Sequence, residues 1–109
     1  MHLYIAIIYK MLDLQAIAGF DWDAGNSRKN ERHGVSVAEA EQVFFNQPLL
    51  MLADDAHSQL ELRYHALGKS AEGRRLHVTF TLRKRGTLIR VISVRDMHRK
   101  ERAIYEQAP

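Results

Sequence analysis

The stretch from Leu76 to Val94 constrains the fold more than any other part of the chain, because it contains two runs with the pattern of β-strands. Along Leu76–Leu82, apolar residues alternate with His77, Thr79 and Thr81. A period of two is typical of a strand with one buried face. The sequence therefore predicts a half-buried strand here, with Arg83 at its solvent-exposed end.

The second run, Leu88–Val94, is largely apolar in both registers of the alternation, which predicts an inner strand covered on both faces. We expect one face to carry Leu88, Ile92 and Val94 and the other to carry Ile89 and Val91. Arg90 and Arg95 interrupt this pattern. Burying an unpaired guanidinium costs roughly several kcal/mol, so each arginine needs an anionic partner. That partner is either a bound phosphate or a carboxylate such as Glu101 or Glu41.

The residues before this stretch predict short helices and strands. Residues 25–32 form a polar helix that Gly34 can close, and Ser36 with Glu39 forms a capping box that starts a second helix, which must end before Pro48. The expected strands are Phe20–Asp23, Leu49–Ala53 and Arg63–Leu67, and Gly68–Arg75 reads as a turn-rich link. We therefore expect one α+β domain with two N-terminal helices, an antiparallel sheet of about four strands and a C-terminal helix.

Composition narrows the class of protein. The 109 residues are 46% hydrophobic, which favours a folded globular chain, and the net charge is +3 with the basic residues concentrated in the last third. A local basic surface suits a nucleic-acid backbone, although a solvated charged face would look the same. Cysteine is absent, which excludes disulfides, thiolate metal sites and a cysteine nucleophile and fits a cytoplasmic location.

The N-terminal residues 1–19 are expected to be an extension that can include an edge strand. Its apolar run Leu3–Ile8 is far shorter than a membrane span, so we expect no membrane partner. Ala16-Ile17-Ala18 resembles a signal-peptide cleavage site, but no basic segment precedes the apolar run. Met11 is an alternative start.

Several polar residues are left over once the core is assigned: His33, Asp54, His57, Arg63, Arg83, Arg90, Arg95, Glu101 and Tyr105. The histidine spacing matches no zinc motif, and the phosphate-binding glycine loop, the dinucleotide fingerprint and the nucleophile elbow are all missing. We expect no cofactor and no metal. Guanidinium groups with a histidine, carboxylates and a tyrosine are sufficient for metal-free cleavage of RNA, which supplies its own 2′-hydroxyl nucleophile.

Each of these residues also has a structural interpretation. His33 can cap a helix, and Asp54 with His57 can build a turn. Exposed arginines at strand ends are common in folded proteins. Tyr105, one helical turn after Glu101, can simply dock the last helix.

The order of several motifs resembles the BrnT family of bacterial toxins. These motifs are F-D-W-D, K-N-E-R-H-G-V-S, A-E-A-E-Q-V-F-F, D-D-A-H-S, R-V-I-S-V-R-D and R-K-E-R-A-I-Y, and they span Phe20 to Tyr105. The resemblance implies a RelE-like ribonuclease that inhibits translation in the cytoplasm. It also implies a cognate BrnA-type antitoxin, which binds the toxin and represses their shared promoter, so that operator DNA is contacted only through the complex.

The resemblance also implies site residues. It places His33, Arg63, Arg83, Arg90, Arg95, Glu101 and Tyr105 in the catalytic set. We expect RNA to contact the basic side chains Arg32, Lys84, Arg85 and Arg99. Protons would be handled by His33, Glu101 or Tyr105, and the sequence does not choose among them.

This chain departs from the family pattern at three points. Arg32 replaces the usual lysine before His33, which excludes proton donation because a guanidinium does not titrate. The segment from Asn30 to His33 is one residue shorter than is common, and Val94 replaces a small alanine.

The alternative function is a nucleic-acid-binding subunit of a repressor complex that does not cleave RNA.

Overall fold

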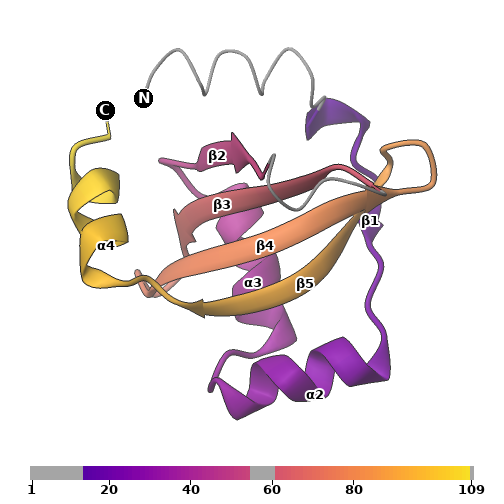
Figure 1. Cartoon of the computed structure of the whole chain (residues 1–109), viewed down its shortest axis with the longest axis horizontal. Coiled ribbons are helices and arrows are strands. Elements are labelled where there is room, and N and C mark those ends of the chain that lie inside the picture. Colours follow the sequence, from indigo (N-terminus) through magenta and orange to yellow (C-terminus); the bar gives the residue numbers. More distant parts are fainter. Residues whose placement is uncertain (1–13, 55–60, 109) are drawn as a thin grey trace.

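The computed structural model describes residues 14–54 and 61–108 (Figure 1). The apolar run Leu3–Ile8, the alternative start at Met11 and most of the expected N-terminal extension lie outside the described residues, as does His57. The elements run in this order: η1 Leu14–Ala16, β1 Gly19–Phe20, α2 Ala24–Arg32, α3 Val37–Gln42, η2 Val43–Phe45, β2 Leu50–Ala53, β3 Arg63–Lys69, β4 Arg75–Arg83, β5 Leu88–Asp96 and α4 Arg99–Glu106.

The strands form one five-stranded sheet in the order β1-β5-β4-β3-β2. Strands β2 to β5 are antiparallel to their neighbours, whereas β1 pairs with β5 in parallel. In Figure 1, α3 crosses behind the sheet, α2 lies below it, and α4 stands at the end where β5 finishes. The α+β class is confirmed, but the expected antiparallel sheet of about four strands is wrong, because the sheet is mixed and has a fifth strand.

The predicted strand Phe20–Asp23 differs from the observed one, which is shorter and pairs in parallel with β5, and this makes the sheet mixed. Only Gly19–Phe20 pairs as β1, and one further hydrogen bond runs from the Asp21 N–H to the carbonyl of Ile89. The alternation of aromatic and acidic residues has another cause. Asp21 and Asp23 turn toward Arg90, and the indole N–H of Trp22 donates to Glu41 at 2.9 Å.

The two N-terminal helices are confirmed. The Glu39 N–H donates to the hydroxyl of Ser36 at 3.1 Å and the Ser36 N–H donates back to the Glu39 carboxylate at 3.2 Å, which is the predicted capping box. Gly34, with φ of +73°, closes α2 as expected. The second helix tightens into η2 and ends at Phe45, before Pro48.

The main core lies between α3, η2 and the sheet, and it includes the fully buried residues Phe80, Met51 and Val43. Gly68 belongs to β3, so the expected link Gly68–Arg75 is shorter than predicted. A Cβ atom at Gly68 would lie 2.7 Å from Cγ1 of Val43 and 3.2 Å from its carbonyl oxygen. The missing side chain therefore lets η2 approach the strand.

A β-bulge in β5 changes which of its residues face the core. Thr79 is opposite Ser93 and Phe80 is opposite Val91, so Ile92 is an extra residue on β5. The bulge turns Val94 back to the core side, where it is fully buried with Ile89 and Val91. The expected placement of Val94 on the face opposite Val91 is therefore wrong. As a consequence, Ser93 and Arg95 point to the opposite face of the sheet, which α2 and α3 do not cover.

Candidate functional site

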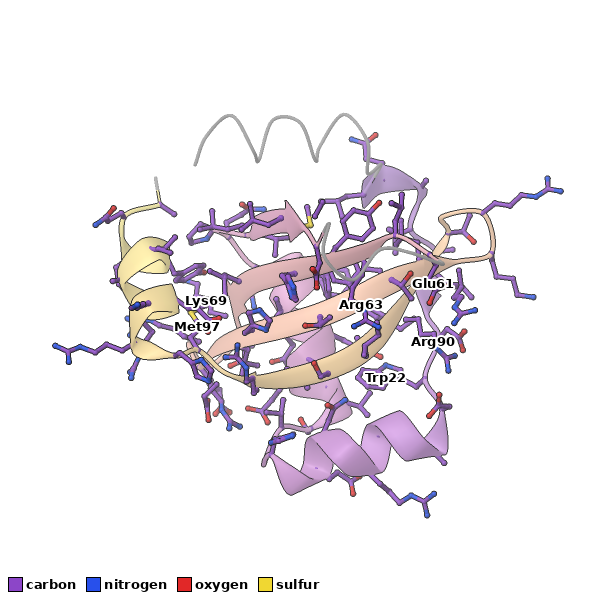
Figure 2. The ribbon with its side chains drawn as sticks, in the orientation of Figure 1. Trp22, Glu61, Arg63, Lys69, Arg90 and Met97 are labelled. Atoms are coloured by element: carbon purple, nitrogen blue, oxygen red, sulfur yellow. The ribbon has the colours of Figure 1, made fainter. Side chains whose placement is uncertain are left out.

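The sheet face opposite α3, here called the open face, carries the polar side chains of three neighbouring strands. Strand register aligns the residues of this face in three rows, which are Arg63–Thr81–Arg90, His65–Thr79–Ser93 and Leu67–His77–Arg95. All of these residues except Leu67 are polar. In Figure 2, Arg63 and Arg90 lie toward one end of the sheet, and Lys69 and Met97 lie toward α4 at the other. Helix α4 covers this second end through a small core of Leu50, Leu67, Met97 and Tyr105.

A hollow of about 530 Å³ opens on this face, between the strands and α4. We call it the open-face hollow and define it by its lining: Leu50, Met51, Leu52, His65, Leu67, His77, Thr79, Ser93, Arg95, Glu101 and Ile104. Its polar groups come from β3, β4, β5 and the start of α4. Its apolar groups come from β2, β3 and the outer part of α4.

His65 is held in one orientation by both of its ring nitrogens. Its Nε2 lies 2.8 Å from Oδ2 of Asp54, and its Nδ1 lies 2.9 Å from the hydroxyl of Thr79. A carboxylate can only accept a hydrogen bond, so Nε2 of His65 donates to Asp54. The ring of His65 also lies 4.9 Å from the ring of His77, centroid to centroid. His65 is therefore a fixed wall of the hollow beside His77.

His77 is neutral at physiological pH. Burial, and to a lesser extent the positive charge of Arg95, its register partner on β5, lower the pKa of His77 to about 4. Glu101 opposes this effect weakly, with its Oε2 3.8 Å from Nε2 of His77. A neutral imidazole on the wall of a hollow is chemically a proton acceptor.

Arg95 and Glu101 form a bidentate ion pair, and both residues line the hollow. Nη1 and Nη2 of Arg95 donate to the two carboxylate oxygens of Glu101 at 2.8 and 3.0 Å. The His98 N–H donates to the same carboxylate at 2.8 Å. Burial alone would raise the pKa of Glu101, but these hydrogen bonds outweigh it and lower the pKa to about 2. Glu101 is therefore ionised and holds Arg95 against α4.

Arg83, Arg90 and Arg95 share the open face of the sheet, and each of them is paired with a carboxylate. Arg90 contacts Asp21 at 3.2 Å and also Asp23, and Arg83 lies 3.5 Å from Glu61. The expectation that Arg90 and Arg95 need anionic partners is confirmed, and Glu101, not Glu41, is the partner of Arg95. Among the arginines in the described part of the chain, only Arg95 lines the hollow, so the guanidinium groups do not gather in one site.

Other candidate residues lie away from the hollow. His33 is exposed in the turn after α2 and does not line the hollow. Tyr105 is buried, and its hydroxyl donates to the carbonyl of Pro48 at 2.6 Å, so it docks α4. Lys84 and Arg85 are exposed at the tip of the β4–β5 hairpin, and Arg99 is exposed at the start of α4. The side chain of Arg32 is outside the described part of the structure.

Sequence reasoning missed His65, His77, Thr79 and Ser93 as site residues. His77 and Thr79 had been interpreted as the polar side of an alternating strand, and Ser93 is on the open face only because of the bulge. A weak signal was present, since histidines occupy polar positions in two successive predicted strands.

Two features are absent from the described residues, a cluster of metal ligands and a membrane-spanning helix. Among residues 14–54 and 61–108, there is no group of three or more histidine, aspartate or glutamate side chains that could hold a metal ion. In the same ranges, no helix has the length and apolar character needed to cross a membrane.

Comparison with known proteins gives one family. Residues 22–101 match the family model described as the ribonuclease toxin BrnT of type II toxin-antitoxin systems. The matched range includes all the polar residues of the open-face hollow. No curated protein sequence matches the chain at a significant level.

Proposed function

Because the chain belongs to the BrnT family of ribonuclease toxins of type II toxin-antitoxin systems, we propose that it cleaves RNA in the open-face hollow without a metal ion. One observation carries this proposal. A neutral histidine, His77, and a cationic Arg95 lie opposite each other on paired strands and line the same hollow. This combination supplies a proton acceptor and a positive charge at the place where RNA chemistry needs both.

In the proposed reaction, His77 accepts the proton of a ribose 2′-hydroxyl. The 2′-oxygen then forms a bond to the adjacent phosphorus, and the bond from phosphorus to the 5′-oxygen breaks. The 5′-oxygen takes a proton from solvent, and the products are a 2′,3′-cyclic phosphate and a free 5′-hydroxyl. The charge that builds on the phosphate oxygens is stabilised by Arg95.

Arg95 can serve a phosphate while it stays paired with Glu101. A guanidinium has five N–H groups, and the hydrogen bonds to Glu101 and to the carbonyl of Asp96 start from Nη1 and Nη2. Glu101 then acts as a positioning residue that sets the direction of the guanidinium plane. Glu101, His33 and Tyr105 are less suited to proton transfer in the hollow. The Glu101 carboxylate is occupied by hydrogen bonds from Arg95 and the His98 N–H, His33 does not line the hollow, and the Tyr105 hydroxyl donates to Pro48.

A type II system pairs its toxin with an antitoxin. We propose that this antitoxin is of the BrnA type and that it covers the open face, so that operator DNA is bound only by the complex. Acidic side chains of the antitoxin would complement Arg95 and the basic hairpin tip at Lys84 and Arg85.

The test is cleavage of single-stranded RNA by purified protein in EDTA, with analysis of the fragment ends. We expect fragments that end in 2′,3′-cyclic phosphate, and we expect His77→Ala to slow cleavage by roughly 10²–10⁴-fold, the usual contribution of a general base. His98→Ser is the matched control, since serine caps a helix well and the histidine removed lies outside the hollow.

Three results would contradict parts of this proposal. Intact RNA with folded wild-type protein would favour the alternative of a nucleic-acid-binding subunit. Cleavage only when Mg²⁺ is added would remove the metal-free chemistry. Full activity of His77→Ala together with loss in His33→Ala would return the proton transfer to His33, one of the three residues that the family resemblance implied.

A further inference from the structure

One half of the open-face hollow has no role in phosphate chemistry. Leu50, Leu52, Leu67 and Ile104 line it, and strand register places Leu52 beside His65 and Leu67 beside His77. Leu52 and Ile104 expose 37% and 39% of their surface, and they approach the hollow from different elements, β2 and α4. Two large apolar side chains kept partly in water at the rim of a polar site indicate a ligand with an apolar part.

We propose that the hollow binds one nucleotide of single-stranded RNA, with the base against the apolar wall of Leu52 and Ile104 and the phosphate at Arg95. This inference rests on the proposed ribonuclease function and adds the form of RNA that the site accepts. A nucleobase has two apolar faces and a polar edge, and a base that stacks on protein must first leave its own stack. The proposal therefore excludes a base that stays paired inside a duplex.

The dimensions and chemistry of the hollow fit this occupant. Its volume of about 530 Å³ falls within the range of about 300–1,000 Å³ that is typical of small-ligand sites. Arg95 and Ile104 both line it, so a phosphate and an apolar surface are available to the same ligand. Ser93 presents a hydroxyl to the hollow, and a hydroxyl can both donate to and accept from the edge of a base.

The first test separates the base from the phosphate. Wild-type protein with labelled methyl groups is titrated with nucleoside 3′-monophosphates and, in parallel, with ribose 5-phosphate and inorganic phosphate, and NMR spectra are recorded. We expect only the ligands that carry a base to shift the methyl signals of Leu52 and Ile104, and to bind at least roughly five-fold more tightly than ribose 5-phosphate, the scale of one apolar contact. Equal affinities, or methyl signals that do not move, would overturn the proposal.

The second test uses variants. Ile104→Ala and Leu52→Ala should raise KM for single-stranded RNA by roughly three- to ten-fold and leave kcat nearly unchanged, because the apolar wall binds the base and does not touch the reacting phosphate. Leu62→Ala is the matched control, since Leu62 is more exposed than either residue and lies outside the hollow.

The outcomes separate this inference from the proposed function. If wild-type protein cleaves RNA and the Leu52 and Ile104 variants match it in KM, the ribonuclease stands and the base site falls. If nucleotides shift the two methyl signals but RNA is never cleaved, the base site stands and the ribonuclease falls. If the two variants lose antitoxin binding with no change in KM, the apolar wall belongs to the antitoxin and the proposal is overturned.

Discussion

His77 gains its chemical character from residues that lie far from it in the sequence. Its ring lies between the ring of His65 on β3 and the guanidinium of Arg95 on β5, and Glu101 approaches from α4. A histidine in water has a pKa near neutrality, and here burial with a neighbouring cation favours the uncharged form. The same shift that keeps His77 unprotonated at neutral pH also makes the fold sensitive to acid.

We predict that His77 makes the protein less stable between pH 6.5 and about 4. The pKa of His77 is about 4 in the folded protein and 6.5 in an unperturbed histidine, so protons bind the unfolded chain more strongly in this range. The contribution of His77 to the free energy of unfolding is fully favourable above pH 6.5. It is lost progressively as the pH falls toward 4 and changes no further below that. Urea unfolding at pH 7.0, 5.5 and 4.5 measures it.

His77→Gln, which cannot be protonated, should flatten the loss of stability between pH 6.5 and 4. His98→Gln serves as the control and should follow the wild type. Glu101, with its pKa lowered to about 2, adds a separate loss that begins only below about pH 4.5, so the two effects occupy different ranges. An unchanged pH profile in His77→Gln would contradict the assignment.

The bulge in β5 is the element that places the site. One extra residue, Ile92, reverses the alternation, so that Val94 enters the core while Ser93 and Arg95 reach the hollow. The outer edge of β5 at this point is bound by a side chain. The Val94 N–H donates to Oδ1 of Asn30 on α2 at 3.1 Å, and Asn30 is 1% exposed. Helix α2 therefore holds the backbone between the two site residues.

We predict that Asn30→Leu destabilises the protein by roughly 1–3 kcal/mol, because the buried Val94 N–H loses its acceptor. Urea unfolding at pH 7 measures the change. Arg28→Ala, an exposed change on the same helix, should stay within about 0.5 kcal/mol of the wild type. If Asn30→Leu were as stable as Arg28→Ala, another group would have to satisfy the Val94 N–H.

On the scale of the whole molecule, the open face has basic groups at both of its ends. The β4–β5 hairpin, with Lys84 and Arg85 at its tip, extends past one end of the sheet, and α4, which starts at Arg99, stands at the other (Figure 1). The open-face hollow lies between them. This arrangement would let a single strand of RNA run across the sheet with its phosphates near cations at each end.

We predict that RNA binding weakens with salt and that the hairpin tip contributes to the effect. For single strands the slope of log affinity against log salt is roughly −0.7 per neutralised phosphate, so Lys84→Gln with Arg85→Gln should make the slope less negative by roughly 1.4. Fluorescence anisotropy with labelled RNA at several salt concentrations measures it. Arg28→Gln, on the helical side, should leave the slope unchanged. A wild-type slope in the double variant would place the hairpin outside the RNA path.

Local pattern was enough to predict most elements but not their partners. Helix α3 was predictable because its capping box joins residues three apart, and β4 because its alternation is carried by its own side chains. Strand β1 was mispredicted, since the acidic residues after Phe20 are explained by Arg90, which is far away in the chain. The same limit applies to the site, where His65 and His77 meet only through strand pairing.

The sequence by itself determined most of the secondary elements, the family and the need of Arg90 and Arg95 for anionic partners. The period of apolar residues, the helix caps and the cost of a buried charge each depend on nearby residues or on one side chain. Only the tertiary structure decided which carboxylates those arginines meet, where β5 carries its extra residue and which side chains share the hollow. These features depend on strand register. A shift of one residue moves a side chain to the other face, and no local pattern records it.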